Sequence, residues 1–402
     1  MEDILVKPLK QLALDEKPME ICERKGLGHP DTICDAIMND ASIELSKEYL
    51  KRFGAILHHN LDKGLISAGG SEVAFGGGKM TNKILIVYGD RATFDVGDEH
   101  VPVEEIVKRS TRDWFKRNLR FVDPDEHLKY QVEVQPGAAS LQDIFARKGR
   151  YLGANDTSAA VGYAPYSRME KLILNVEGYM NSQEFKKRFP ESGEDVKIMG
   201  FRNGDGVSLT VAQAFVDRYI ESEADYFRKK GEIYNAIDSF IKEKSDFDNV
   251  EVGFNVLDAK GRGLNGLYLT VLGSSIDTGD SGQVGRGNNV IGVIPLNRPM
   301  SSEAAAGKNP VSHVGKIYNL LSYKIAGEIC QNVNGVKETY VWLVSAIGQS
   351  IDKPAVCSAQ VITADGVSLE EITPQIQEVI ASEFDRLDEF CMDLAKGKVN
   401  IK

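Results

Sequence analysis

The chain has 402 residues, 42% of them hydrophobic, which is enough to bury a large core and to form more than one domain. Its 48 basic and 59 acidic side chains give a formal net charge of −11, which disfavours nucleic-acid or anionic-membrane binding without a local basic patch, and the sequence has none. The five cysteines are scattered without a C-x-x-C pair, and no apolar run is long enough for a signal peptide or a membrane span. We therefore expect a cytoplasmic protein without disulfides or a zinc site.

The hydrophobic pattern predicts both helices and strands along the chain. Residues 31–52 carry apolar side chains at four-residue spacing behind a proline, which is typical of an amphipathic helix, and residues 103–119 are similar. Short β-branched or aromatic runs predict strands at 84–88, 130–134, 172–176, 196–201, 250–256, 267–272, 290–294, 340–344 and 356–362. Longer helical patterns follow at 210–244, 310–332 and 369–396. The sum predicts a mixed α/β (α+β) fold with sheets packed by long helices.

No low-complexity linker divides the chain, so we expect one compact unit over residues 1–402. Three strand-rich segments, each followed by a long helix, indicate a weak threefold plan. They correspond to residues 1–125, 126–248 and 249–402 in rough terms, because composition marks no boundary.

Glycine and charge gather in four segments, of which residues 23–31 are the first (Glu-Arg-Lys-Gly-Leu-Gly-His-Pro-Asp). Pro30 suits the first helical position, which places His29 at the cap, beside two glycines and the positive end of the helix dipole. This arrangement is typical of a phosphate site that contains a proton donor, and Asp31 is a candidate ligand for Mg²⁺. An ordinary capped helix with an exposed His29 explains the pattern about equally well.

The second segment runs from residue 58 to residue 79. His58 and His59 are adjacent, so in a strand they point to opposite faces, and an ordinary strand is a better interpretation than a shared metal ion. Lys63 is a candidate phosphate cation and Glu72 a candidate anchor for a substrate ammonium. Each of them alone is more often a solvated surface charge.

Two later segments complete the set. Residues 277–289 contain no Walker motif, but their G-x-x-G-R loop offers backbone N–H groups and the guanidinium of Arg286 to a phosphate; a glycine-rich hairpin is the alternative. Residues 301–313 place Lys308 after a glycine and just before a predicted helix, which describes a second anion cradle. No nucleophile elbow, HExxH or Rossmann fingerprint is present. The residues alone indicate a magnesium-nucleotide or polyphosphate enzyme.

These motifs resemble those of the S-adenosylmethionine synthetase family, in the same order. Residues 28–31 are similar to its GHPD signature, residues 280–286 to its D-x-G-x-x-G-R loop, and residues 306–310 to its S-G-K-D-P segment. The longer strings 23–38, 58–78 and 277–313 resemble the archaeal branch, and the resemblance covers essentially the whole chain. It implies synthesis of S-adenosylmethionine from ATP and L-methionine with Mg²⁺. It also implies three similar, interleaved α/β subdomains and a homodimer with active sites between subunits.

The resemblance also implies site residues. His29 would contact the departing phosphate chain, Asp31 would hold Mg²⁺, and Asp280 would face the adenosine and methionine moieties. Gln135 resembles the start of a flexible loop that covers the site. We therefore expect the catalytic residues His29, Lys63, Arg286 and Lys308; the ATP-binding residues Gly28, His29, Pro30, Gln135, Gly137, Ser140, Asp280, Gly285, Arg286, Ala304, Gly307 and Lys308; the methionine-binding residues Ser71, Glu72, Gln135, Asp156 and Asp280; and the metal ligands Glu23 and Asp31.

The sequence departs from the bacterial branch at several charges. Thr32, Gly287 and Asn309 stand where that branch has two lysines and an aspartate, and Lys63 is a candidate to replace a lost positive charge. The bacterial potassium-binding glutamate falls near His58 by spacing, which argues against a potassium requirement.

The absence of a catalytic triad fits the implied reaction. The sulfur of methionine is a neutral thioether, so its attack on C5′ of ATP needs no general base. Cations and Mg²⁺ would stabilise the leaving triphosphate, which the family then hydrolyses to phosphate and pyrophosphate. A different Mg-ATP ligase or kinase, or a nucleotide-binding protein without catalysis, are the alternatives, and the nucleotide product distinguishes them.

Overall fold

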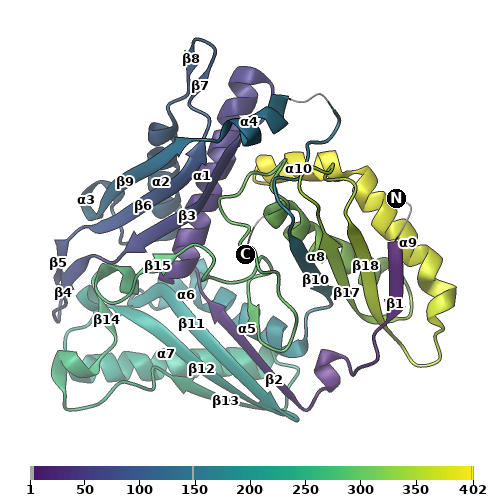
Figure 1. Cartoon of the computed structure of the whole chain (residues 1–402). Helices are drawn as coiled ribbons and strands as arrows, with labels where there is room; N and C mark the ends of the chain where they lie inside the picture. Colours follow the sequence, from purple (N-terminus) through teal and green to yellow (C-terminus); the bar gives the residue numbers. More distant parts are fainter. Residues whose placement is uncertain (1–3, 147–148, 400, 402) are drawn as a thin grey trace.

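The structure is a computed structural model that describes residues 4–146, 149–399 and 401. Its described part contains three larger β-sheets, each packed by helices (Figure 1). Each sheet joins strands that are far apart in the sequence, so the three units are interleaved along the chain. The predicted mixed α/β class is confirmed, while the segment boundaries near residues 125 and 248 stay a prediction.

Sheet I has the strand order β15-β3-β6-β9 and packs against α1. The helix α1 begins where His29 caps it and ends at Gly54, whose φ of 69° favours a residue without a Cβ. The elements of this part are α1 (Pro30–Phe53), β3 (His59–Ser67), β4 (Gly70–Glu72), β5 (Lys79–Asn82), β6 (Ile84–Ala92), β7 (Asp95–Val96), β8 (Glu99–His100), α2 (Val103–Asn118), α3 (Pro124–His127), β9 (Leu128–Pro136), α4 (Ala139–Ala146) and β15 (Gly282–Gln283).

Sheet II has the order β13-β12-β11-β2-β16, with β14 beside β12, and α5 packs on β2 and β11. Gly200 in β11 allows this close packing, because a Cβ there would lie 2.7 Å from side-chain atoms of both Met169 and Ile173. The elements are β2 (Met19–Lys25), α5 (Arg168–Met180), α6 (Gln183–Arg188), β11 (Ser192–Asn203), β12 (Gly206–Val216), η2 (Asp217–Tyr219), α7 (Glu223–Lys244), β13 (Asn249–Phe254), η3 (Gly263–Gly266), β14 (Leu269–Thr270), η4 (Ser275–Asp277) and β16 (Ile294–Pro295).

Sheet III has the order β1-β18-β17-β10 and packs against α8 and α9. Its edge strand β1 pairs in parallel with β18, from Ile4 opposite Cys357 to Pro8 opposite Val361. The elements are β1 (Ile4–Pro8), η1 (Leu14–Glu16), β10 (Ala159–Ala164), α8 (Val314–Asn332), β17 (Val336–Val344), β18 (Val356–Thr363), α9 (Leu369–Asp385) and α10 (Leu387–Ala395).

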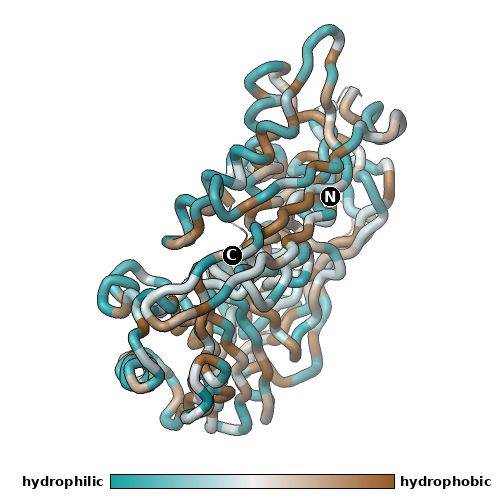
Figure 2. The backbone as a smooth tube through the Cα atoms, turned by 90° about the vertical axis from the view of Figure 1, so that its left-hand side faces the viewer, coloured by the Kyte–Doolittle hydropathy of each residue, from teal (hydrophilic) through white to brown (hydrophobic). Residues whose placement is uncertain are grey.

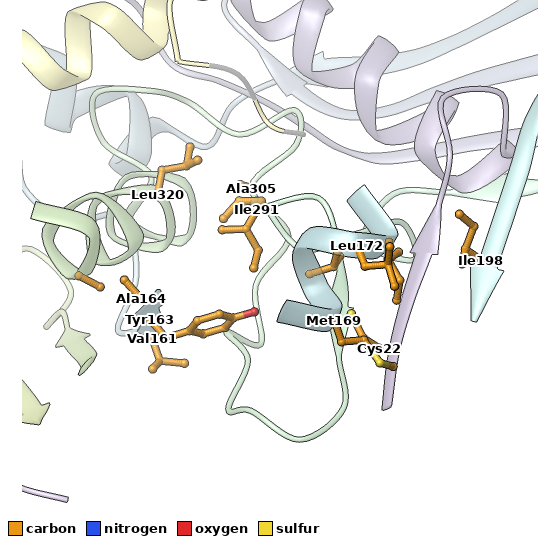
Figure 3. Packing of buried hydrophobic residues seen from close by; sticks show 14 of the residues in the cluster. Cys22, Val161, Tyr163, Ala164, Met169, Leu172, Ile198, Ile291, Ala305 and Leu320 are labelled. Carbon is orange, nitrogen blue, oxygen red and sulfur yellow. The ribbon is translucent and has the colours of Figure 1, made fainter. Parts of the chain in front are cut away.

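Buried hydrophobic side chains form two clusters, one shared by sheets II and III and one between α1, α2 and sheet I. Figure 3 shows part of the shared cluster, where Met169 and Leu172 of α5 lie beside Cys22 of β2. Along the backbone, hydrophobic positions gather in the interior, and hydrophilic ones dominate the hairpin that projects at the top of Figure 2. No helix of the described residues is long and apolar enough to cross a membrane.

Two predicted elements are wrong. Residues 172–176, predicted as a strand, lie inside α5, because a capping box of Ser167 and Glu170 starts a helix ahead of them. A five-residue segment with four apolar residues does not distinguish a buried helix face from a strand. Residues 210–244, predicted as one helix, include the second half of β12, and α7 begins only after the cap at Ser222.

Other differences concern the ends of elements. The helix predicted from residue 310 begins at Val314, where His313 caps it, and the helix predicted at 369–396 is divided at Arg386. The strands predicted at 267–272 and 290–294 shrink to the two-residue strands β14 and β16. The remaining predicted helices and strands are confirmed, within a few residues at their ends.

Candidate active site

The N-terminus of α1 presents His29 on a backbone that is held from two sides. The N–H of Gly28 donates to the carbonyl of Glu194 (3.0 Å), and the hydroxyl of Ser274 donates to the carbonyl of Gly28 (2.6 Å). A Cβ at Gly28 would overlap the backbone between Glu194 and Asp195. This position therefore requires glycine, and the contact places the cap of α1 against sheet II.

His29 is 7% exposed, and its Nδ1 accepts the N–H of Asp31 at 3.2 Å. Burial lowers the pKa of His29 to about 4, although the Asp31 carboxylate opposes this shift. The ring is therefore neutral at pH 7. Because Nδ1 accepts, the proton is assigned to Nε2, which makes that atom a hydrogen-bond donor.

The glycine-rich loop 282–287 docks on the first turns of α1. Gln283 donates its N–H to Asp31 Oδ1 (3.0 Å), and Gly285 donates its N–H to Asp35 Oδ1 (2.9 Å). Lys25 donates to Asp31 Oδ2 (2.9 Å) and also to the backbone carbonyl of Arg286. The GHPD segment and the glycine-rich loop, about 250 residues apart in sequence, thus form one unit.

The Lys308 segment lies beside this unit. A Cβ on Gly285 would lie 3.2 Å from the Cβ of Ala304, and the two loops line a cavity of about 70 Å³ together with Asp35. Gly307 fits because a Cβ would lie 2.5 Å from the carbonyl oxygen of Leu61. The structure therefore brings all four predicted segments together in a single chain, the second of them through β3.

Lys308 is buried among carboxylates. Its Nζ lies 2.7 Å from Asp62 Oδ2 and 3.0 Å from Glu303 Oε2. Burial raises the pKa of Asp62, but hydrogen bonding from Asp90 and the Lys308 ammonium outweigh it and leave the pKa below its usual value. Lys63 also pairs with Asp62 (2.6 Å), yet its side chain is 66% exposed. Lys308 is therefore a buried cation held by two carboxylates, and Lys63 is an exposed cation that shares Asp62 with it.

Arg286 is exposed, and its guanidinium makes no hydrogen bond or ion pair with any described residue. Asp280 lies at the start of the same loop, where its carboxylate accepts the N–H of Ser281 (2.9 Å). The loop that docks on α1 therefore offers an unpaired guanidinium among the described residues, and a guanidinium suits a polyphosphate.

The expected methionine-binding residues and the covering loop make contacts of their own. The hydroxyl of Ser71 lies 3.4 Å from Asp277 Oδ1, and Glu72 forms an exposed ion pair with Lys79 (3.2 Å). Asp156 accepts the N–H of Thr157 (2.7 Å) in an exposed loop. Gln135 lies near the end of β9, Gly137 packs against His58, and Ser140 is in the backbone of α4. In the described part of the chain, no hydrogen bond or ion pair joins Ser71, Glu72, Gln135, Gly137, Asp156 or Asp280 to His29, Asp31 or Lys308.

The carboxylate of Asp31 fits a magnesium ligand. It already holds the Lys25 ammonium, so its position favours a cation, and Mg²⁺ needs only one or two protein carboxylates when phosphate oxygens complete its shell. Glu23, the second predicted ligand, instead pairs with Lys197 at 3.1 Å. Within the described ranges, no group of three or more His, Cys, Asp and Glu side chains could hold a metal ion alone.

Sequence reasoning missed Lys25, Asp35, Asp62 and Glu303. One available signal was the four-residue spacing of Asp31 and Asp35, which places both carboxylates on the same face of α1. The pairing of Lys308 with Asp62 and Glu303 depends on the tertiary fold.

Glycine-rich segments that carry His29, Arg286 and Lys308 meet near the N-terminus of α1, and this arrangement is typical of enzymes that handle polyphosphate. The sequence model of the S-adenosylmethionine synthetase (AdoMet synthetase) family matches residues 2–398. The chain belongs to this family, and its reaction is the synthesis of S-adenosylmethionine as a methionine adenosyltransferase.

Individual relatives agree with this assignment. The chain is 40% identical over 399 residues to the S-adenosylmethionine synthase of Methanothermobacter thermautotrophicus and 41% identical over 406 residues to that of Methanocaldococcus jannaschii, and each alignment covers 99% of both chains. A solved structure of an unusual S-adenosylmethionine synthetase from Campylobacter jejuni shares the fold, with a TM-score of 0.59 over 94% of each chain at 16% sequence identity.

Proposed function

We propose that this cytoplasmic enzyme joins ATP to L-methionine at the cluster formed by His29, Arg286 and Lys308. The sulfur attacks C5′ of ATP, the S–C5′ bond forms, and the C5′–O bond breaks with its electron pair leaving on the triphosphate. No proton must be removed from the sulfur. The observation that supports this proposal most strongly is the contact between the segments that carry these three residues.

Negative charge that develops on the leaving triphosphate is stabilised by groups already in place. His29 donates from Nε2, Lys308 contributes a buried ammonium, and Arg286 offers a guanidinium that no described residue occupies. Asp31 would hold Mg²⁺, which supplies further neutralisation of phosphate oxygens. The same cations would assist hydrolysis of tripolyphosphate to phosphate and pyrophosphate. Removal of one such donor should slow the reaction by about 10²–10³-fold.

Product analysis tests this reaction. Purified protein with ATP, methionine and Mg²⁺ should form S-adenosylmethionine, one phosphate and one pyrophosphate per turnover. ADP or AMP as the stoichiometric nucleotide would reject it and favour a kinase or ligase. His29→Ala should keep the fold, checked by circular dichroism, and slow sulfonium formation at least a hundredfold; unchanged turnover would remove His29 from the mechanism.

We also propose a homodimer in which the methionine half of each site comes from the partner subunit. The exposed position of Asp156 supports this arrangement, because within the described residues its carboxylate accepts only the N–H of Thr157 and is open to a partner subunit. Light scattering should give twice the chain mass. An inactive His29→Ala variant mixed with an inactive Asp156→Ala variant should recover up to a quarter of wild-type activity, because one site of the mixed dimer is intact. No recovery despite subunit exchange would place both residues in one subunit's site.

A further inference from the structure

Asp35 lies one turn after Asp31 on α1 and contacts the glycine-rich loop at the residues on both sides of Arg286. Its Oδ1 accepts the N–H of Gly285 at 2.9 Å. The backbone N–H of Gly287 also interacts with the carboxylate, and Gly287 lies so close to Oδ2 that a Cβ would overlap it. The carbonyl of Arg286 accepts a hydrogen bond from Lys25, which Asp31 holds. Three consecutive loop residues are therefore fixed to one end of α1.

The side chain of Arg286 contrasts with its backbone. The backbone is attached to α1 through Asp35 and Lys25, whereas the guanidinium is exposed and makes no ion pair with a described residue. The direction in which the side chain leaves the loop thus depends on the backbone contacts. Because His29 caps the same helix, the contacts of Asp35 fix the position of the Arg286 backbone relative to His29.

We propose that Asp35 is a positioning residue for the reaction, which holds the backbone on both sides of Arg286 and so directs its guanidinium to the phosphate tail of ATP. This inference rests on the proposed contact of Arg286 with triphosphate. Asp35 acts through Arg286 and touches neither substrate. Loss of its acceptor should therefore reduce kcat for both sulfonium formation and tripolyphosphate hydrolysis, and leave KM for methionine within twofold.

Asp35→Asn is the sharpest variant, because it keeps the shape of the side chain. The amide oxygen can still accept from Gly285, but the NH₂ group cannot accept from Gly287. We expect kcat to fall about 10- to 100-fold, against about 10²–10³-fold for Arg286→Ala. The double variant should be within threefold of Arg286→Ala, because Asp35 has nothing left to position. Asp40→Asn is the matched control on the same helix: Asp40 pairs with Arg117 at 2.7 Å and makes no hydrogen bond to residues 282–287, so the activity of this variant should be unchanged.

Gly287→Ala probes the same contact from the loop, since its Cβ would overlap Asp35 Oδ2, and it should give the same kinetic pattern if Asp35→Asn unfolds. Wild-type turnover by Asp35→Asn, or losses that multiply in the double variant, would overturn the inference. If wild-type protein forms S-adenosylmethionine while Arg286→Ala is fully active, the proposed role of Arg286 fails, and the positioning role fails with it. If wild-type protein forms no S-adenosylmethionine, the proposed function itself fails.

Discussion

His59 connects α1 to the segment that carries Lys308, and acid should destabilise the folded protein through the ring of this histidine. The side chain is fully buried, its Nε2 lies 2.8 Å from Ser42 Oγ, and its Nδ1 lies 3.2 Å from Asn309 Nδ2, next to Lys308. Burial lowers the pKa of His59 to about 3, although the carbonyl of Leu57 opposes the shift. The folded protein therefore keeps this ring neutral at pH 5 and above.

The unfolded chain behaves differently, because a free imidazole titrates near pH 6.5. Below that pH the unfolded state binds a proton that the folded state excludes, so stability falls as the pH decreases from 6.5 towards 3. At pH 5 the ratio of protonated to neutral imidazole in the unfolded state is about 30, which corresponds to a loss of about 2 kcal/mol relative to pH 7.5. A folded-state pKa one unit higher would change this figure little.

The measurement compares wild type with His59→Gln, which keeps a polar group but cannot titrate. Free energies of unfolding in urea at pH 7.5 and pH 5, at one protein concentration, should show that wild type loses about 2 kcal/mol more than the variant. The variant is less stable at pH 7.5, so the two stability curves should approach each other in acid. Parallel curves would refute the reasoning, because they would mean that His59 binds its proton equally in both states.

Three further outcomes follow from the site. Lys308→Met removes a buried cation and should lower kcat about 10²–10³-fold. Lys63→Met removes an exposed cation and should lower kcat roughly tenfold or less. Equal losses would contradict the distinction between the buried and the exposed lysine. Gly28→Ala should lower the free energy of unfolding, measured by thermal melts, by about 1–3 kcal/mol and should reduce activity. Gly178→Ala is the control, because open space surrounds its Cβ, and it should raise the free energy of unfolding by up to about 1 kcal/mol. EDTA should abolish activity, and Asp31→Asn should increase the Mg²⁺ concentration for half-maximal activity by about 10-fold or more; an unchanged Mg²⁺ titration would exclude Asp31 as a ligand.

The fold was predictable where local signals agreed with each other. The helix α1 has an apolar period, a proline in its first turn and a glycine at its C-terminus, and its predicted bounds of 31–52 are confirmed within one residue. Prediction failed where apolar runs were short or continuous. Residues 172–176 are helical because of the cap at Ser167. The strand β12 is followed by η2 and α7, and no glycine or proline in the sequence marks the end of the strand.

The residues of the candidate site also divide into those that local sequence predicts and those that it does not. His29, Arg286 and Lys308 lie in segments that combine glycine with charge, so a single sequence was enough to select them. Asp62 was not predictable, because an acidic residue in a strand is usually a solvated charge, and the spacing of Asp35 from Asp31 indicated only that the two share a face of α1. The role of Asp35 arises when the loop, whose residues 282 and 283 pair with β3, reaches α1. The role of Asp62 arises when Lys308 meets the start of β3. The methionine-binding residues stay a prediction, since within the described residues no hydrogen bond or ion pair joins them to His29 or Lys308.

The parallel pairing of β1 with β18 affects how the protein is made. On the ribosome, β18 emerges roughly 350 residues after its partner, which takes about 20–70 s at typical rates of translation. During that interval the backbone groups of β1 lack their native partner, and nascent chains that have not reached β18 are exposed to aggregation at this strand. Chaperone demand and yield in heterologous expression should therefore depend on how rapidly the ribosome completes the second half of the message.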